Sequence, residues 1–347
     1  MGSIQVTHHP SVSHPSYFLQ SSFLPGDQSV FFTSYRTGAA HLWTVSLEDG
    51  SLSQLTDGPA IHPFSPAYDE RRDEIVFTRG GSLETLDRVI FTLPSGGQLG
   101  ECSLSACGDW AVAAFRLGSG QGLAVGRLDG SGWKLIPFPR TVIHPQFHPL
   151  EPEWIEFAGD PAPRMHRVRR DGSGLECLYE HSNDEFVVHE TFLGQTGDLV
   201  FTVWPFRLCR MDWTTREMSV IVEHNAWHIA PNRAGTEILF DTNHPDRGIQ
   251  IVDVASGSIR DVCPSEASNG GSQWRESRYA LAEDFARARS EAAGNLSWME
   301  AGVDTVYGPQ WTHPHPSWSR DERRIAFASD RTGHTQVYIA DVPRLSA

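Results

Sequence analysis

The stretch "SVFFTS" at residues 29–34 decides the fold, because six later stretches repeat its pattern. They are "EIVFTR" (74–79), "WAVAAF" (110–115), "WIEFAG" (154–159), "DLVFTV" (198–203), "EILFDT" (237–242) and "RIAFAS" (324–329). Each is a short run of β-branched and aromatic residues, as in a strand buried on both faces. Their phenylalanines are 45, 38, 42, 44, 39 and 87 residues apart. This period predicts propeller blades, which are about 40 to 50 residues long.

Most of these stretches are followed by a second strand-like run and a turn, as in "HLWTVSLEDGS" and "GIQIVDVASGS", which indicates one β-meander per repeat. The 87-residue gap has room for an eighth blade. However, its segment "SQWRESRYALAEDFARARSEAAGN" (272–295) is rich in Ala, Glu and Arg and lacks strand alternation, which favours a helix. We therefore predict an all-β chain, a seven-bladed β-propeller forming a single domain over residues 1–347, with a helical insertion before the last blade.

The two ends of the chain predict how the ring closes. The last repeat ends at "QVYIADVPRLSA" without room for an outer strand, whereas "SIQVTHH" (3–9) precedes the first blade as a spare strand. We expect the N-terminal strand to complete the C-terminal blade, which leaves no break in the ring. A two-domain α/β fold is disfavoured because no long helices alternate with the strands.

Composition limits the function. The formal net charge is −15, from 28 basic and 43 acidic residues, so the overall field repels nucleic acids. No apolar run is long enough for a membrane helix, and the first residues lack a secretion signal, so we expect a cytoplasmic protein without a membrane partner. The five cysteines are odd in number and scattered, which argues against a disulfide framework.

The segment "QWTHPHPSW" (310–318) concentrates metal-ligand types. Pro314 and Pro316 favour extended backbone at the two histidines before them, and side chains two apart on an extended chain point the same way. His313 and His315 can then face one ion, whereas Gln310 joins them only if the chain turns between residues 310 and 313. A metal site would need a further ligand from another blade. From the spacing alone, a metal site and a capping loop whose histidines hydrogen-bond to the backbone are equally favoured.

Residues 310–343, "QWTHPHPSWSRDERRIAFASDRTGHTQVYIADVP", resemble the C-terminal blade of oligogalacturonate lyases, the seven-bladed propeller enzymes of polysaccharide lyase family 22. "NLSW" (295–298), just before it, resembles the same family. In that family a Gln-x-x-His-x-His segment provides three ligands to manganese, which implies Gln310, His313 and His315 here. "WHIAPNRAGTEILF" (227–240) resembles the segment with the fourth ligand, which implies His228.

The same resemblance implies catalytic and substrate-binding residues. "VHETF" (188–192) matches the segment whose histidine is the Brønsted base, here His189, and "RMHRVRRDG" (164–172) the segment whose arginine assists catalysis, here Arg164. "SHPSYFLQSSF" (13–23) matches an N-terminal His-x-x-Tyr-Phe-x-Gln pattern, which places His14, Tyr17 and Gln20 near the substrate.

These residues suit β-elimination from a short acidic oligosaccharide. The C5 proton beside an ionised uronate carboxylate is weakly acidic, so neutralising charge there is the main demand. A metal would act as Lewis acid, His189 would take the proton, and Arg164 would stabilise the developing charge. Neutral ligands suit manganese, cobalt, nickel and zinc about equally, so Mn²⁺ rests on the resemblance. We expect activity to rise with pH through about 6 to 7, where histidine titrates.

Two other functions stay open at this point: another metal-dependent reaction on a sugar acid, and a non-catalytic propeller of the TolB binding type. The chain departs from the family in a compact third blade (115–134) and in "EFAGDPAP" (156–163), which replaces a His- and Glu-bearing stretch. The substrate is therefore less defined than the metal site. His144 receives no role from the sequence, and Glu190 is interpreted as a solvated neighbour of His189.

Overall fold

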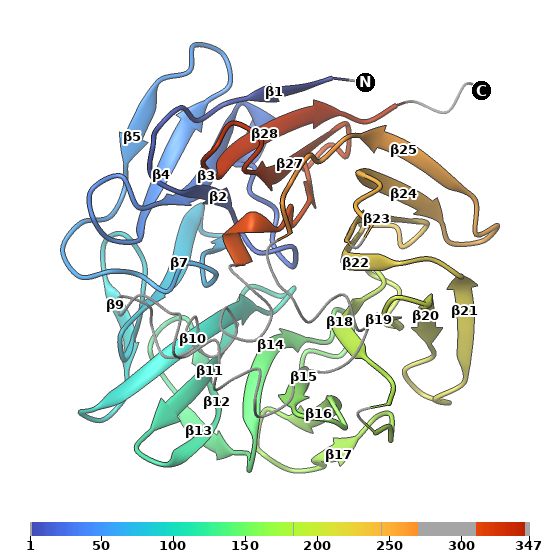
Figure 1. Cartoon of the computed structure of the whole chain (residues 1–347). Coiled ribbons are helices and arrows are strands. Elements are labelled where there is room, and N and C mark those ends of the chain that lie inside the picture. The colour runs from blue at the N-terminus through green and yellow to red at the C-terminus, as the bar shows by residue number, and fades with distance from the viewer. Residues whose placement is uncertain (1, 183, 244, 270–309, 344–347) are drawn as a thin grey trace.

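The computed structural model describes residues 2–182, 184–243, 245–269 and 310–343. Within those ranges the chain forms seven four-stranded sheets set around a central axis (Figure 1). The predicted all-β, seven-bladed propeller is confirmed. The helix predicted at 272–295 and the segment at 295–298 lie outside the described residues.

In each of the first six blades the innermost strand comes first in the chain, and each later strand pairs antiparallel with the one before it. Blade one contains β2 (Ser13–Pro15), β3 (Ser29–Ser34), β4 (His41–Ser46) and β5 (Leu52–Gln54), with the short 3-10 helix η1 (Pro25–Asp27) between β2 and β3. Blade two contains β6 (Ala67–Asp69), β7 (Glu74–Arg79), β8 (Ser82–Glu84) and β9 (Val89–Thr92). Blade three contains β10 (Gly97–Leu104), β11 (Trp110–Leu117), β12 (Gly120–Arg127) and β13 (Lys134–Pro137).

The remaining blades continue around the ring. Blade four contains β14 (Thr141–Phe147), β15 (Trp154–Asp160), β16 (Met165–Arg169) and β17 (Glu176–Cys177). Blade five contains β18 (Val187–Phe192), β19 (Leu199–Val203), β20 (Arg207–Met211) and β21 (Met218–Val222). Blade six contains β22 (Ala226–Pro231), β23 (Glu237–Thr242), β24 (Ile249–Asp253) and β25 (Ile259–Cys263). Blade seven contains β26 (Ser317–Trp318), β27 (Arg324–Ser329), β28 (Gln336–Asp341) and β1 (Ser3–Gln5), and the 3-10 helix η3 (Gln310–Thr312) precedes it.

The seven repeated stretches of the sequence all form the second strand of a blade. Their phenylalanines are buried: Phe32, Phe77, Phe115, Phe157, Phe201, Phe240 and Phe327. They belong to apolar clusters that fill the space between neighbouring blades, such as the one formed by blades three and four and the one formed by blades six and seven. Burying such a side chain contributes about 1.5–3 kcal/mol, so the repeats hold the ring together.

The ring closes as the sequence predicts. β1 pairs antiparallel with β28, with Ser3 opposite Ala340, Ile4 opposite Ile339 and Gln5 opposite Tyr338. Figure 1 shows β1 lying along the outer edge of the last blade. The N-terminal strand therefore gives blade seven its fourth strand and covers the edge of β28.

Two expectations from composition can be compared with the structure. All five cysteines are free, which agrees with the absence of a disulfide framework. Among the described residues, no helix is long and apolar enough to cross a membrane.

The innermost strands of blades three to six each contain a β-bulge, which the hydrophobic pattern of the sequence does not predict. In each, two residues of the inner strand lie opposite one residue of the second strand. The bulged pairs are Gly100–Glu101, His144–Pro145, His189–Glu190 and Trp227–His228. The bulges release these residues from the regular ladder in the innermost strands of four consecutive blades, which gathers polar side chains such as those of Glu101, His144, His189 and His228 near the axis.

Candidate metal centre

Three histidines form one compact cluster at the axis. His228 comes from the bulge of β22, and His313 and His315 from the chain between η3 and β26. Each offers a ring nitrogen, and these atoms all lie within 4.8 Å of one another. All three residues are buried. The predicted meeting of His228 with the histidines of residues 310–318 is therefore found in the structure.

Asp241 on the neighbouring strand orients the His228 ring. One carboxylate oxygen accepts the backbone N–H of His228 at 2.6 Å, and the other lies 2.7 Å from Nδ1 of the ring. If Nδ1 donates its proton to Asp241, Nε2 carries the lone pair. That Nε2 atom is buried and has no hydrogen-bond partner among the described residues. A carboxylate behind a metal-binding histidine has this arrangement in many metal sites.

His315 presents its other nitrogen. Its Nε2 lies 3.0 Å from the backbone carbonyl oxygen of Gln310, so Nε2 carries the proton. Nδ1 then has the lone pair, and it too is buried without a hydrogen-bond partner in the described part of the chain. The backbone differs from the expectation, because His315 has φ of 45°, in the left-handed region and not the extended one. The two histidines therefore do not face one point because of an extended backbone, as the sequence led us to expect.

Gln310 lies where the sequence argument needs a turn. Residues 310–312 form η3, and the His313 N–H donates to the Gln310 carbonyl oxygen at 3.0 Å. The turn that Gln310 required in order to join His313 and His315 is thus present, and Gln310 is buried.

Burial favours the neutral form of His228 and His315, and metal ligands must be neutral imidazoles. Burial, followed by the neighbouring His313 and His144, lowers the pKa of His228 well below its ordinary value. Burial, followed by His228 and His313, does the same for His315. Burial also raises the pKa of Asp241 to about 7. The lowered pKa values of His228 and His315 favour lone pairs on those two rings at neutral pH.

His189 lies beside the triad. Its ring centroid is 4.4 Å from that of His228 and 4.4 Å from that of Trp227. It is a bulge residue with φ of 57°, and its buried Nδ1 has no hydrogen-bond partner among the described residues. Burial, followed by His228 and His144, lowers its pKa well below the ordinary value. His189 is therefore a neutral imidazole next to the triad, as a general base must be.

Arg164 is fully buried and bound to carboxylates. Its Nε donates to Glu190 Oε1 at 2.9 Å, and its Nη1 lies 3.3 Å from Asp160 Oδ1. Burial is the largest single influence on Glu190 and would raise its pKa, but the charges and hydrogen bonds of Arg164 and His144 together outweigh burial and bring the pKa to about 2. Arg164 thus joins blade four to blade five. The interpretation of Glu190 as a solvated residue was wrong, since it is 0% exposed.

The N-terminal segment inserts aromatic rings into the cluster. The Tyr17 ring lies 4.9 Å from that of His315 and 6.2 Å from that of His228. The Phe18 ring lies 5.1 Å from that of His189 and 5.4 Å from that of His228. His14 packs on Phe64 at 4.8 Å, and burial lowers its pKa to about 4. Tyr17 therefore packs on the triad and His14 lies close to it, while their role near a substrate stays a prediction.

Gln20 lies elsewhere. It lines a cavity of about 580 Å³ together with residues from the C-terminal ends of the inner strands, such as Phe147, Phe192 and Pro231. The bulge histidines come from the preceding part of those strands. Phe18 both lines this cavity and contacts the histidines, so it separates the two. The structure does not bring Gln20 into the histidine cluster.

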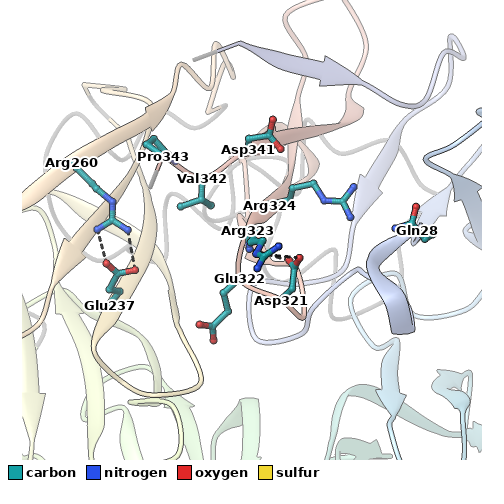
Figure 2. Close-up of a pocket in the computed structure, with 10 residues that line it drawn as sticks. All are labelled: Gln28, Glu237, Arg260, Asp321, Glu322, Arg323, Arg324, Asp341, Val342 and Pro343. Carbon is teal, nitrogen blue, oxygen red and sulfur yellow. Dashed lines mark hydrogen bonds and ion pairs between the residues drawn. The ribbon is translucent and has the colours of Figure 1, made fainter. Parts of the chain in front are cut away.

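A second groove is chemically unlike the triad. Figure 2 shows this groove of about 770 Å³, lined by residues including Glu237, Arg260, Asp321 and Arg323. Two pairs of its charged groups bind each other, with Arg260 Nη1 2.7 Å from Glu237 Oε1 and Arg323 Nε 4.0 Å from Asp321 Oδ2. Its lining residues include no histidine. The histidine cluster is the better candidate for chemistry.

The sequence analysis missed four polar residues of this region: Glu101, His144, Glu190 and Asp241. Three of them are bulge residues, and the bulges are not visible in the hydrophobic pattern. Asp241 had one available signal: it is an acidic residue inside the otherwise apolar "EILFDT" repeat. A carboxylate within a buried strand needs a partner, which pointed to a nearby donor.

The residues present fit a divalent transition metal. The donors are neutral imidazole nitrogens that converge within 4.8 Å, and two of them are oriented by hydrogen bonds on the opposite ring nitrogen. This set suits manganese, cobalt, nickel or zinc. Fold and site together define a seven-bladed β-propeller with a buried histidine triad that could hold a metal ion, beside a neutral histidine.

Comparison with known proteins shows which enzymes this chain is similar to. The chain is 19% identical to an oligogalacturonide lyase of Pectobacterium atrosepticum and 21% identical to an oligogalacturonate lyase of Dickeya dadantii, in each case over 98% of this chain and 93% of the relative. A solved structure of an oligogalacturonate lyase in complex with manganese superposes with a TM-score of 0.78 at 17% identity, covering 98% of this chain and 93% of that one. No family model matches the sequence. The chain is thus oligogalacturonate lyase-like along almost its whole length.

Proposed function

We propose that this protein is a metal-dependent lyase that cleaves short oligogalacturonides or related uronides by β-elimination. The observation that carries the proposal is the buried triad of His228, His313 and His315 with the neutral His189 at its side. The full-length similarity to two lyases supports it, and the manganese complex of a structural neighbour favours manganese as the ion.

The metal would be held by His228, His313 and His315, with Gln310 as a fourth ligand. A divalent ion held by these neutral ligands keeps its full charge, which stabilises the negative charge that develops on a uronate carboxylate during proton removal. An anionic substrate needs such a local positive charge in a protein of net charge −15.

The chain's own residues perform the proton transfer and the positioning. His189 accepts the C5 proton, since its lone pair is available at neutral pH. Arg164 fixes the carboxylate of Glu190, the residue that follows the base, and so holds the bulge that presents His189. In this proposal the positive charge of the Arg164 guanidinium also stabilises the negative charge that develops at the reacting carbon.

The direct test combines metal analysis with a product assay. The purified protein is expected to contain a divalent transition metal and, with manganese, to convert digalacturonate or unsaturated digalacturonate to 5-keto-4-deoxyuronate. Mass spectrometry of the products and absorbance of the unsaturated group both report the reaction. Absence of product with every uronide tested, from metal-loaded protein, would contradict the proposal.

Substitutions connect the activity to this site. His189→Ala is expected to lower kcat by roughly 10²- to 10⁴-fold while the metal content stays unchanged. His313→Ala is expected to lose the metal. His224→Ala is a matched control, because His224 binds Gln250 at 2.8 Å outside the cluster, and it should keep both metal and rate.

A further inference from the structure

Tyr17 begins a connected line of polar groups that ends at Arg164. The Tyr17 hydroxyl lies 2.9 Å from His144 Nε2. On the other side of the same ring, Nδ1 of His144 lies 3.7 Å from Glu190 Oε2, an electrostatic contact longer than a hydrogen bond. Glu190 in turn accepts the Arg164 Nε–H at 2.9 Å. A phenol, an imidazole and a carboxylate thus follow one another, with a guanidinium behind them.

His144 is held in this line against the preference of its backbone. Its φ is 54°, a left-handed value that costs a residue other than glycine about 1–3 kcal/mol. Its backbone N–H donates to Glu101 Oε2 at 2.7 Å, across the boundary between blades three and four. Glu101 is the bulge residue of the preceding blade. Two neighbouring bulges therefore cooperate to place one imidazole behind Tyr17, which points to a role for that ring.

The line approaches the metal triad from a different side than His189 does. The Tyr17 ring packs on His315 at 4.9 Å, whereas the His189 ring packs on His228 at 4.4 Å. The His144 and His189 centroids are 5.9 Å apart. Two proton-carrying groups, a phenol backed by His144 and a free imidazole, therefore border the same small volume.

We propose that Tyr17 is the general acid of the reaction, with His144 as the residue that resupplies its proton and the Glu190 carboxylate as the negative charge that faces the His144 ring. This proposal rests on the proposed lyase function. The C5–H bond breaks as the proton passes to His189, the electron pair forms the C4=C5 double bond, and the C4–O bond breaks. The departing oxygen takes the Tyr17 proton, and His144, as an imidazolium facing the Glu190 carboxylate, passes its Nε2 proton to the phenolic oxygen and becomes neutral. His189 then returns one proton to solvent and His144 recovers one, so protons balance.

The chemistry of a phenol favours Tyr17 as a proton donor and not as a proton acceptor. A tyrosine hydroxyl has an ordinary pKa near 10, and that of Tyr17 lies 2.9 Å from His144 Nε2. The hydroxyl therefore keeps its proton at neutral pH. A departing sugar oxygen is a strong base once its bond to C4 breaks, so proton transfer from a positioned phenol contributes to the rate. General acids of this kind typically contribute about 10²- to 10⁴-fold.

The test compares two leaving groups at C4. Digalacturonate expels a sugar oxygen that needs a proton, whereas a galacturonate with a 2,4-dinitrophenyl ether at C4 expels a phenolate that does not. Tyr17→Phe and His144→Asn are expected to lower kcat on digalacturonate by roughly 100-fold or more, with a small change in KM, and to leave the rate on the aryl ether within about threefold. Asparagine is chosen at 144 because it tolerates the left-handed backbone.

Control variants make the outcomes separable. Tyr338→Phe removes another buried hydroxyl, which donates to Gln5 Oε1 at 2.9 Å in blade seven, and should not change either rate. His189→Ala should lose activity on both substrates, because each reaction needs removal of the C5 proton. Equal losses on both substrates in Tyr17→Phe, or a loss below about tenfold on digalacturonate, would overturn the assignment of the acid. A metal-loaded wild type without activity on either substrate would instead remove the proposed function and this inference together.

Discussion

At the scale of single residues, Asp241 shows how one buried carboxylate opposite a bulge prepares a site. The bulges of blades four and five lie opposite Phe157 and Phe201, whereas the bulge of blade six lies opposite Asp241. The carboxylate therefore occupies a place that is apolar in the neighbouring blades. It binds the backbone and the ring of His228 and also accepts the His315 N–H at 3.3 Å. One residue thus connects ligands from two parts of the chain.

We expect Asp241→Asn to lower manganese affinity by about 10- to 100-fold. An asparagine has one acceptor oxygen, so its NH₂ group must face either the backbone N–H or Nδ1 of His228. In the second case the ring changes tautomer and Nε2 becomes a donor, which cannot bind metal. Isothermal titration with Mn²⁺ measures the change. Asp253→Asn, at a turn in blade six, is the control, and an unchanged affinity in Asp241→Asn would contradict the role.

The pH dependence follows from the burial of His189. The sequence led us to expect a rise in activity through about pH 6 to 7, the range of an ordinary histidine. Burial and the neighbouring His228 and His144 hold the pKa of His189 well below 6.5. Only the neutral ring accepts a proton, so the fall in kcat on acidification is expected below pH 6, with little change from pH 6.5 to 8. A rate profile in manganese tests this, and a midpoint between 6 and 7 would contradict it.

At the scale of elements, the sequence predicts the strands well and their irregularities poorly. The repeats "SVFFTS" to "RIAFAS" become the second strands because their apolar pattern is local and buried on both faces. The bulges of β14 and β18 depend on contacts between blades, such as the Glu101 carboxylate on the His144 N–H and the Gln146 side chain on the Glu190 carbonyl. Such long-range contacts leave no periodic signal. The positive φ of His144, His189 and His315 was therefore not predictable.

The closing strand offers a test at this scale. Deleting residues 2–6 removes the pairing of β1 with β28 and the bond from Tyr338 Oη to Gln5 Oε1. With about 0.5–1.5 kcal/mol for each hydrogen bond, the free energy of unfolding should fall by roughly 2–5 kcal/mol. Urea denaturation measures this loss. Ile4→Ser is the control, because Ile4 is 72% exposed and its replacement should change stability by less than about 0.5 kcal/mol. Equal stability of the deletion variant would contradict the closure.

At the scale of the whole molecule, the site is made by the ring. His14 and Tyr17 come from blade one, Glu101 from blade three, His144 from blade four, His189 from blade five, His228 from blade six, and His313 and His315 from the entry to blade seven. No local segment contains the set, so its assembly could be expected only from the resemblance and from the propeller itself. The resemblance located the triad and His189. It gave no account of the charge balance between Arg164 and Glu190, which depends on burial.

Metal binding should therefore stabilise the ring as a whole. An ion bound by His228, His313 and His315 joins β22 to the chain that enters β26, and it binds the folded state alone. Mn²⁺ at about 100 times its Kd is expected to add about 2.7 kcal/mol to the free energy of unfolding. Differential scanning calorimetry with and without a chelator measures the shift in Tm. The His313→Ala variant should show no shift, and an equal response in both proteins would contradict binding at this site.

The shared bulge of blades three to six has one more consequence, which concerns how such a protein could change over time. Each bulge holds two residues outside the strand ladder, so those two positions can be replaced while the hydrogen bonds on either side stay in register. Side chains can therefore change at Gly100–Glu101, His144–Pro145, His189–Glu190 and Trp227–His228, provided that the contacts that hold a bulge are kept, such as Glu101 on the His144 N–H and Arg164 on Glu190. Mutation at these eight positions can explore new acids, bases and ligands at the axis, while the buried phenylalanines between the blades preserve the fold.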